Sequence, residues 1–164
     1  MGDPARIESL GDRLDLVPTV ADWCWQQWGE ESISSQVSWT ATVAGRLKED
    51  RVPFSLVAVL DGQPVGAVSV CWDDADPDVE AEGPWLTGMI VRGPARNLGI
   101  GRQLLAEACA RAGAMGHSEL WAHTAEAERF YERCGWEVVR PKEPLRRDAV
   151  VRHALADPEA GDEG

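Results

Sequence analysis

The stretch that decides the fold runs from Trp85 to Ala114 and reads WLTGMIV, RGPARNLGIG and RQLLAEACARAGA in succession. The apolar run at its start predicts a buried strand. In its last part, apolar residues recur on one face of a helix, at Leu104, Leu105, Ala108, Cys109 and Ala112. The stretch therefore predicts a strand, a glycine-bearing loop and the N-terminus of a helix.

The loop between these two elements has the chemistry of a pyrophosphate site. The first turn of a helix offers unpaired N–H groups and partial positive charge, and glycines let a ligand come close to them. Arg96 and Arg102 add fixed positive charge. Two nucleotide-binding motifs are excluded, because Gln103 replaces the Ser/Thr of a Walker loop and Leu104 the last glycine of a dinucleotide fingerprint. The simpler alternative is a helix N-terminus that contains two glycines and binds no ligand.

A second informative stretch runs from Trp121 to Trp136 and reads WAHTAEAERFYERCGW. Its spacing predicts a short strand and then a helix over about 125–134, which Gly135 ends. Taken in order, the two stretches resemble the acyl-CoA loop R-x-x-G-x-G and the Phe-Tyr-Glu helix of the GNAT superfamily of N-acetyltransferases. The resemblance covers residues 54–140 well, and earlier residues match only in their predicted elements.

The resemblance implies a fold, a cosubstrate and a set of site residues. The fold would be α/β, with a mixed, mostly antiparallel central sheet of six to seven strands flanked by about four helices. The cosubstrate would be acetyl-CoA, with Tyr131, the sole tyrosine, as general acid toward its sulfur. The residues implied in cofactor binding are Met89, Ile90, Val91, Arg96, Asn97, Leu98, Gly99, Ile100, Gly101, Arg102 and Thr124.

The sequence departs from the family pattern at two places. The proline before the loop, Pro94, comes one position later than is usual in the family. An asparagine often follows the fifth strand, whereas this chain has His123 and Thr124 there. Thr124 would then replace the asparagine as a cofactor contact, or the contact would be missing.

The proton acceptor for an amine substrate is the open question. An aliphatic amine is protonated at pH 7, so a base or a desolvated pocket must release its proton. The acidic connection over residues 73–83 leads into the central strand, and we expect the base there, with Glu82 or Asp73 as first choices and Asp74 and Glu80 as alternatives. Glu30 and Glu31 could contact the amine, although a solvated loop is the simpler interpretation. A solvated surface would explain the acidic connection equally.

The remaining elements complete an alternating α/β pattern. We expect strands over 6–10, 53–60, 65–72, 119–123, 136–139 and 148–154, and further helices over 17–28 and 33–48. Asp61-Gly62 predicts a hairpin turn, and Ser34, Ser35 or Ser38 could cap the second helix. One domain over 1–156 and an acidic, flexible tail over 157–164 account for the chain.

The composition and net charge of the chain limit the functions that it can have. The net charge of −12 disfavours binding to nucleic acid or anionic membranes and suits a cationic amine, although solubility alone would also explain it. The four cysteines and three histidines lack metal-ligand spacing, so we expect buried free thiols and no metal. Without a signal peptide or membrane span, a cytoplasmic address is expected. A homodimer is an expectation by analogy.

Three functional hypotheses follow. The first is an N-acetyltransferase that moves an acetyl group from acetyl-CoA directly to a primary amine of a small molecule or peptide. The second is a non-catalytic acyl-CoA sensor, which would need the loop but not Tyr131. The third is an interaction domain in which the acidic surface binds a basic partner.

Overall fold

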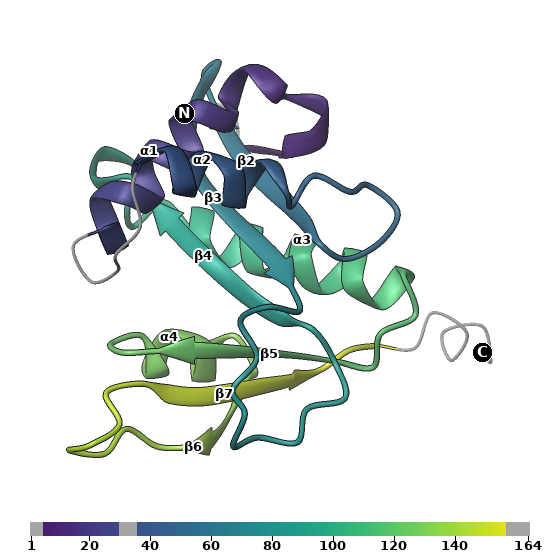
Figure 1. Ribbon diagram of the computed structural model, residues 1–164, viewed down its shortest axis with the longest axis vertical. Helices are drawn as coiled ribbons and strands as arrows, with labels where there is room; N and C mark the ends of the chain where they lie inside the picture. Colours follow the sequence, from purple (N-terminus) through teal and green to yellow (C-terminus); the bar gives the residue numbers. More distant parts are fainter. Residues whose placement is uncertain (1–4, 30–35, 157–164) are drawn as a thin grey trace.

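A computed structural model describes residues 5–29 and 36–156 (Figure 1). It contains one seven-stranded sheet in the order β1-β2-β3-β4-β5-β7-β6. The strands are β1 (Arg6–Ser9), β2 (Phe54–Leu60), β3 (Gln63–Cys71), β4 (Trp85–Val91), β5 (Glu119–Thr124), β6 (Glu137–Arg140) and β7 (Ala149–Ala154). Only β4 and β5 pair in parallel, and every other neighbouring pair is antiparallel. The expected mixed, mostly antiparallel sheet is confirmed.

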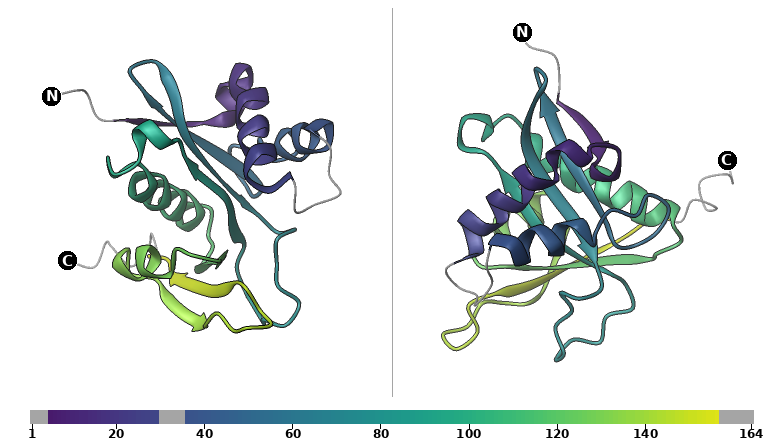
Figure 2. Two further views of the ribbon diagram at one scale, coloured as in Figure 1. Left: turned by 90° about the vertical axis from the view of Figure 1, so that its left-hand side faces the viewer. Right: turned by 45° about the horizontal axis from the view of Figure 1, so that its top comes forward.

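The helices cover both faces of the sheet (Figure 2). They are α1 (Val17–Trp28), α2 (Gln36–Ala44), α3 (Ile100–Ala114) and α4 (Glu128–Arg133). One hydrophobic cluster packs α1 and α2 against one face, and a larger cluster packs α3 and α4 against the other. This arrangement follows from the sequence, because most residues of β2 and β3 are apolar on both faces of the strand, so both faces must be buried.

The packing of α3 against β3 fixes where the glycine-bearing loop lies. Gly66 in β3 has no side chain, and a Cβ there would lie 3.1 Å from Leu104 and 3.3 Å from Ile100. The missing methyl therefore lets the N-terminal half of α3 lie close on the sheet. Leu104 is fully buried at this contact.

Strands β4 and β5 pair over only two residue pairs, Trp85 with Trp121 and Leu86 with Ala122. Beyond them, β4 bulges against β3, with Gly88 in a left-handed conformation (φ +64°). We call the place where the two strands part the β4–β5 fork. Thr87 and His123 are the first residues past the last pair.

The connection between β3 and β4 lies over the face of β5 and β7 opposite α3 (Figure 1). Val79 and Ala81 pack there on a cluster of Trp85, Trp121 and Val150. Arg140 Nη2 lies 2.7 Å from a carboxylate oxygen of Asp76, and both side chains are mostly buried. The connection, which was expected as an acidic loop, is thus an ordered strap that joins the two halves of the sheet.

Most predicted elements are confirmed, and the differences have local causes. The first helix has the predicted bounds, and the Asp61-Gly62 turn has positive φ at both residues. The fourth helix starts at Glu128 instead of about residue 125, because Thr124 Oγ1 accepts a hydrogen bond from the N–H of Ala127 and holds the preceding turn. The second helix ends at Ala44, four residues earlier than predicted. Ser38 lies inside that helix and does not cap it, while Ser34, Ser35 and the acidic tail lie outside the described residues.

We expect Leu104→Ala to lower the free energy of unfolding by about 2–5 kcal/mol, because it leaves a cavity between α3 and β3. Leu145→Ala is the matched control, since that side chain is 97% exposed and its loss should change stability by less than about 0.5 kcal/mol. Urea unfolding of both variants checks this. Equal effects of the two substitutions would contradict the packing described for α3.

The ion pair that holds the strap should make the stability of the fold depend on pH. Hydrogen bonding from Arg140 lowers the pKa of Asp76 in the folded protein. The ionised carboxylate therefore stabilises the fold fully at a pH above the pKa of aspartate in the unfolded chain, about 3.9. This stabilisation is lost as the pH falls through the lower pKa of the folded state. Asp76→Asn should therefore cost about 1 kcal/mol at pH 7, and the difference should vanish in strong acid.

Asp78→Asn is the control for this experiment, because the Asp78–Arg146 pair is largely exposed and contributes little. Urea unfolding over a pH series measures both variants. A cost for Asp76→Asn that stays constant down to pH 2 would show that the ion pair with Arg140 does not carry the effect.

Candidate active site

The loop before α3 is shaped by two residues in left-handed backbone conformations, Asn97 (φ 67°) and the N-cap Gly99 (φ 78°). Glycine adopts this conformation without strain, and asparagine is the next most tolerant type. Within the part of the chain that the structure describes, the backbone N–H groups of residues 97–102 donate no hydrogen bond to the protein. The loop therefore presents a row of free donors at the positive end of a helix dipole.

A pocket of about 420 Å³ opens along this loop, and we call it the loop pocket. It is lined by Val91, Ala95, Arg96, Asn97, Gly99, Ile100, Gly101, Arg102, Phe130 and Arg133. The charged side chains in this lining are three arginines, so the pocket is electropositive in a protein of net charge −12. Free N–H donors, guanidinium groups and close-lying glycines together fit a pyrophosphate.

Seven of the residues predicted to bind a cofactor come together in the loop pocket, and four do not line it. Met89 is half-buried on the α3 side of β4, whereas Ile90 is buried on the α1 side. Leu98 is exposed. Thr124 is buried and its hydroxyl accepts the bond that orders the turn before α4.

The Tyr131 side chain is 4% exposed and lies between the rings of Phe130 and Trp136. It belongs to the hydrophobic cluster that includes Leu86 and Ala122, the last residue pair before the fork. Burial raises the pKa of Tyr131, with Cys134 and Cys109 adding to the effect. The phenol thus stays protonated at neutral pH, as a proton donor must.

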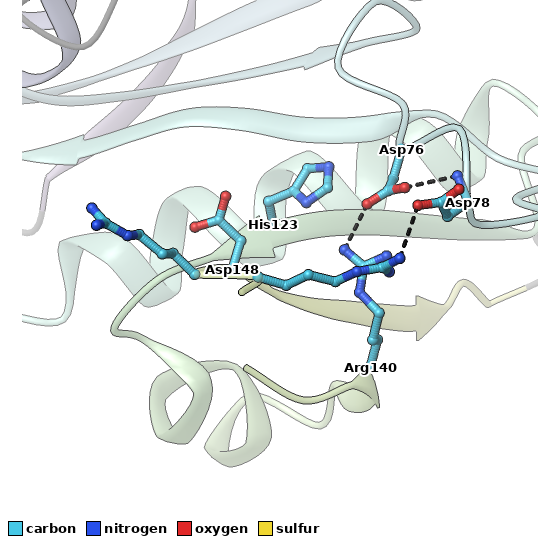
Figure 3. A pocket seen from close by; sticks show the side chains of 7 residues that line it. Asp76, Asp78, His123, Arg140 and Asp148 are labelled. Carbon is cyan, nitrogen blue, oxygen red and sulfur yellow. Dashed lines mark hydrogen bonds and ion pairs between the residues drawn. The ribbon is translucent and has the colours of Figure 1, made fainter. Parts of the chain in front are cut away.

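A second hollow, of about 250 Å³, lies on the opposite face of the sheet at the fork, and we call it the β5 basin (Figure 3). Its lining is Asp76, Asp78, His123, Arg140, Arg146, Arg147 and Asp148. Figure 3 shows the His123 ring standing up from β5, with Asp148 on one side and Asp76 and Asp78 on the other. The imidazole stacks on Trp85, with ring centroids 4.8 Å apart and planes 22° apart.

The four carboxylates named as bases differ in their surroundings. Asp73 is exposed and pairs with Arg46 at 3.5 Å, and a hydrogen bond with Cys71 and the charge of Arg46 lower its pKa. Asp74 is half-buried, and burial raises its pKa against the opposing effects of His123 and the Thr87 hydroxyl. Glu80 and Glu82 are exposed. Of the four, Asp74 is the one that interacts with the fork.

Sequence reasoning did not single out Phe130, Arg133 or His123 as site residues. Phe130 and Arg133 line the loop pocket one helical turn apart on α4, a spacing that the sequence did contain. In the sequence, His123 was noted only as a departure from the family pattern. Its place beside Trp85 could not be predicted, because the stacking of the two rings depends on the parallel register of β4 and β5. Glu30 and Glu31 lie outside the described residues.

The four cysteines are free thiols, with Cys24 and Cys71 buried and the other two half-buried, as the sequence predicted. Within residues 5–29 and 36–156, no three His, Cys, Asp or Glu side chains gather closely enough to hold a metal ion. No helix in these ranges is long and apolar enough to cross a bilayer.

Solved structures share the fold at low sequence identity. An aminoglycoside 6′-N-acetyltransferase from Enterococcus faecium gives a TM-score of 0.70 at 16% identity, over 92% of this chain and 97% of that one. An aminoglycoside 6′-N-acetyltransferase complexed with coenzyme A gives 0.70 at 17% identity, with the same coverage. A GNAT family N-acetyltransferase from Escherichia coli in complex with CoA gives 0.62 at 21% identity, over 96% of this chain and 86% of that one.

Sequence comparison identifies the family. A search among curated proteins found no match to this chain. The sequence model described as the acetyltransferase (GNAT) family, by contrast, matches residues 17–136. The match spans the strap, the fork, the loop pocket and α4. The chain therefore belongs to the acetyltransferase (GNAT) family.

Proposed function

We propose that the protein transfers an acetyl group from acetyl-CoA to a primary amine of a small molecule or peptide. The observation that carries the proposal is the loop pocket, with its free N–H donors over residues 97–102 and its three arginines, two at the start of α3 and one at the end of α4. These groups suit the pyrophosphate of coenzyme A, and solved relatives of the same fold contain that molecule.

Strand β4 would direct the rest of the cosubstrate. Val91 lines the loop pocket and is the last residue of β4, so a ligand anchored at residues 96–102 can continue along the strand toward the fork. Arg96 Nε donates a 3.2 Å hydrogen bond to the Val91 carbonyl, which holds the loop against this strand end. The backbone of Met89, Ile90 and Val91 would bind the pantetheine arm. Bound acetyl-CoA supplies the acetyl group as a thioester.

Tyr131 would act from the α3 side of the fork. Its buried, protonated phenol can give a proton to the departing thiolate, which becomes a thiol. A hydroxyl that is desolvated and oriented by two aromatic neighbours loses little entropy when it acts. Transfer would be direct, from the thioester to the amine.

One observation favours the alternative of a non-catalytic acyl-CoA sensor. Tyr131 lines neither the loop pocket nor the β5 basin. A sensor would keep the basic loop pocket and would not depend on the phenol.

The acceptor is proposed only as an amine. The net charge of −12 supports a cationic one, but the β5 basin itself balances three aspartates with three arginines. A cytoplasmic location and a homodimer stay predictions.

Binding of acetyl-CoA is the first test. Acetyl-CoA at about a hundred times its dissociation constant should stabilise the protein by about 2.7 kcal/mol in thermal unfolding. The double variant Arg96→Ala, Gly99→Asp should lose this stabilisation, because it removes a cation and puts a carboxylate among the free N–H donors. Arg6→Ala, an exposed change far along the chain, is the control. No stabilisation of folded wild type at millimolar acetyl-CoA would refute both acyl-CoA hypotheses.

Tyr131→Phe separates enzyme from sensor. The substitution removes only the hydroxyl and keeps the ring between Phe130 and Trp136. We expect kcat for acetyl transfer to an amine panel to fall by about a hundredfold or more, while the dissociation constant of acetyl-CoA stays unchanged. Unchanged turnover in the variant would remove Tyr131 from the mechanism. An absence of turnover in wild type that binds acetyl-CoA would favour the sensor.

A further inference from the structure

The β4–β5 fork has two sides, and the proposed function uses only one of them. Tyr131 belongs to the cluster on the α3 side, whereas the His123 imidazole lies on the other face, in the β5 basin. His123 follows directly on Ala122, the last residue of β5 that pairs with β4. A thioester that lies in the fork would therefore have the imidazole beside it, on the face opposite the phenol.

We propose that His123 is the group that accepts the proton of the acceptor amine. The inference rests on the proposed acetyl transfer and assigns the proton acceptor that the carboxylates of the strap were expected to supply. Imidazole is the ordinary side chain that changes protonation near neutral pH, which suits a base for an enzyme working there.

The His123 ring is held on a rigid support. It projects from the middle of the sheet, where His123 pairs with Val150 of β7. Its stacking on Trp85 fixes the ring plane, and the Trp85 side chain is itself 1% exposed. One face of the imidazole packs on Trp85. The ring is half-buried and remains accessible from the basin.

The charges around His123 come from three segments. The strap contributes Asp74, Asp76 and Asp78, and the first two interact electrostatically with the imidazole. Arg140 ends β6, and Arg146 lies in the connection that follows it. These two arginines bind Asp76 and Asp78, at 2.7 and 3.2 Å.

Two groups nearest to the start of β7, Arg147 and Asp148, also line the basin and form no ion pair among the described residues. They are of opposite sign, and Figure 3 shows Asp148 on one side of the imidazole.

Two carboxylates of the strap are poorer proton acceptors. A carboxylate that is bound to a guanidinium gains little from a proton, because protonation breaks the ion pair. This applies to Asp73 and Asp76, whose pKa values are lowered beside Arg46 and Arg140. Glu80 and Glu82 are exposed and line neither the basin nor the loop pocket.

The step balances without any further reactant. His123 takes a proton from the substrate ammonium, and the freed nitrogen lone pair attacks the thioester carbonyl carbon. The C–N bond forms and the C–S bond breaks, and the thiolate takes a proton from Tyr131. The new amide nitrogen gives up its second proton, which restores the tyrosine through solvent, and His123 releases its proton to solvent. The net products are an amide, coenzyme A and one proton.

The test is the pH profile of kcat/KM for an accepted amine at saturating acetyl-CoA. His123→Gln should lower kcat/KM about a hundredfold at pH 7 and remove the acid limb that enzyme protonation gives in wild type. The amine's own ionisation is the same for every variant, so differences between profiles report on the enzyme.

His117→Gln is the matched control, since His117 also contacts a tryptophan ring, Trp72, but lines neither pocket. Its profile should equal that of wild type. The dissociation constant of acetyl-CoA should be the same in all variants, which separates loss of the base from loss of the fold. If His123→Gln fails to fold, the imidazole of wild type can be followed by NMR, and its protonation midpoint must coincide with the acid limb of kcat/KM.

The outcomes separate the two proposals. An unchanged acid limb in folded His123→Gln, or an NMR midpoint that differs from the limb, would overturn the assignment of His123 and leave acetyl transfer standing. Wild type that binds acetyl-CoA and transfers acetyl to no amine would overturn both.

Discussion

The pairing of β4 with β5 is the constraint on which the rest of the molecule depends. Among the strands of residues 5–29 and 36–156 it is the only parallel pairing, and it ends after two residue pairs. A strand that leaves its neighbour exposes main-chain N–H and C=O groups that need other partners. At the fork such groups lie in the middle of an otherwise continuous sheet.

The local charge of the two pockets differs from the net charge of the whole chain. The net charge of −12 predicts an acidic protein surface, yet the loop pocket is lined by three arginines, and the β5 basin balances acids with bases. A focused local field determines which ligand a pocket takes, whereas net charge governs solubility and encounter. The whole-chain charge is therefore a weak argument about the acceptor amine, which the local field of a pocket would select.

The sequence contained most of the fold and about half of the candidate site. The loop and helix of residues 92–114 are local in sequence, so the glycines, arginines and helical spacing together predicted the loop pocket. The structure of the strap could not be predicted in the same way. Residues 73–83 have no periodic pattern, so the sequence does not indicate which carboxylate is buried. Asp73 and Asp74 are neighbours in the chain, yet one pairs with Arg46 in solvent and the other is half-buried beside the fork. His123 was undervalued for the same reason, since its stacking on Trp85 joins strands separated by a whole crossover helix.

The strap links stability to the geometry of the fork. It is fixed at its far end, where a Cβ on Gly83 would clash with the Glu119 carbonyl oxygen, so the chain passes directly against the start of β5 before it enters β4. It is fixed in its middle by the ion pair of Asp76 with Arg140. Asp76, which that ion pair holds, lines the β5 basin together with His123. A substitution at Arg140 should therefore displace Asp76 from its place in the basin, because a loop is only as precise as the contacts that hold it to the sheet.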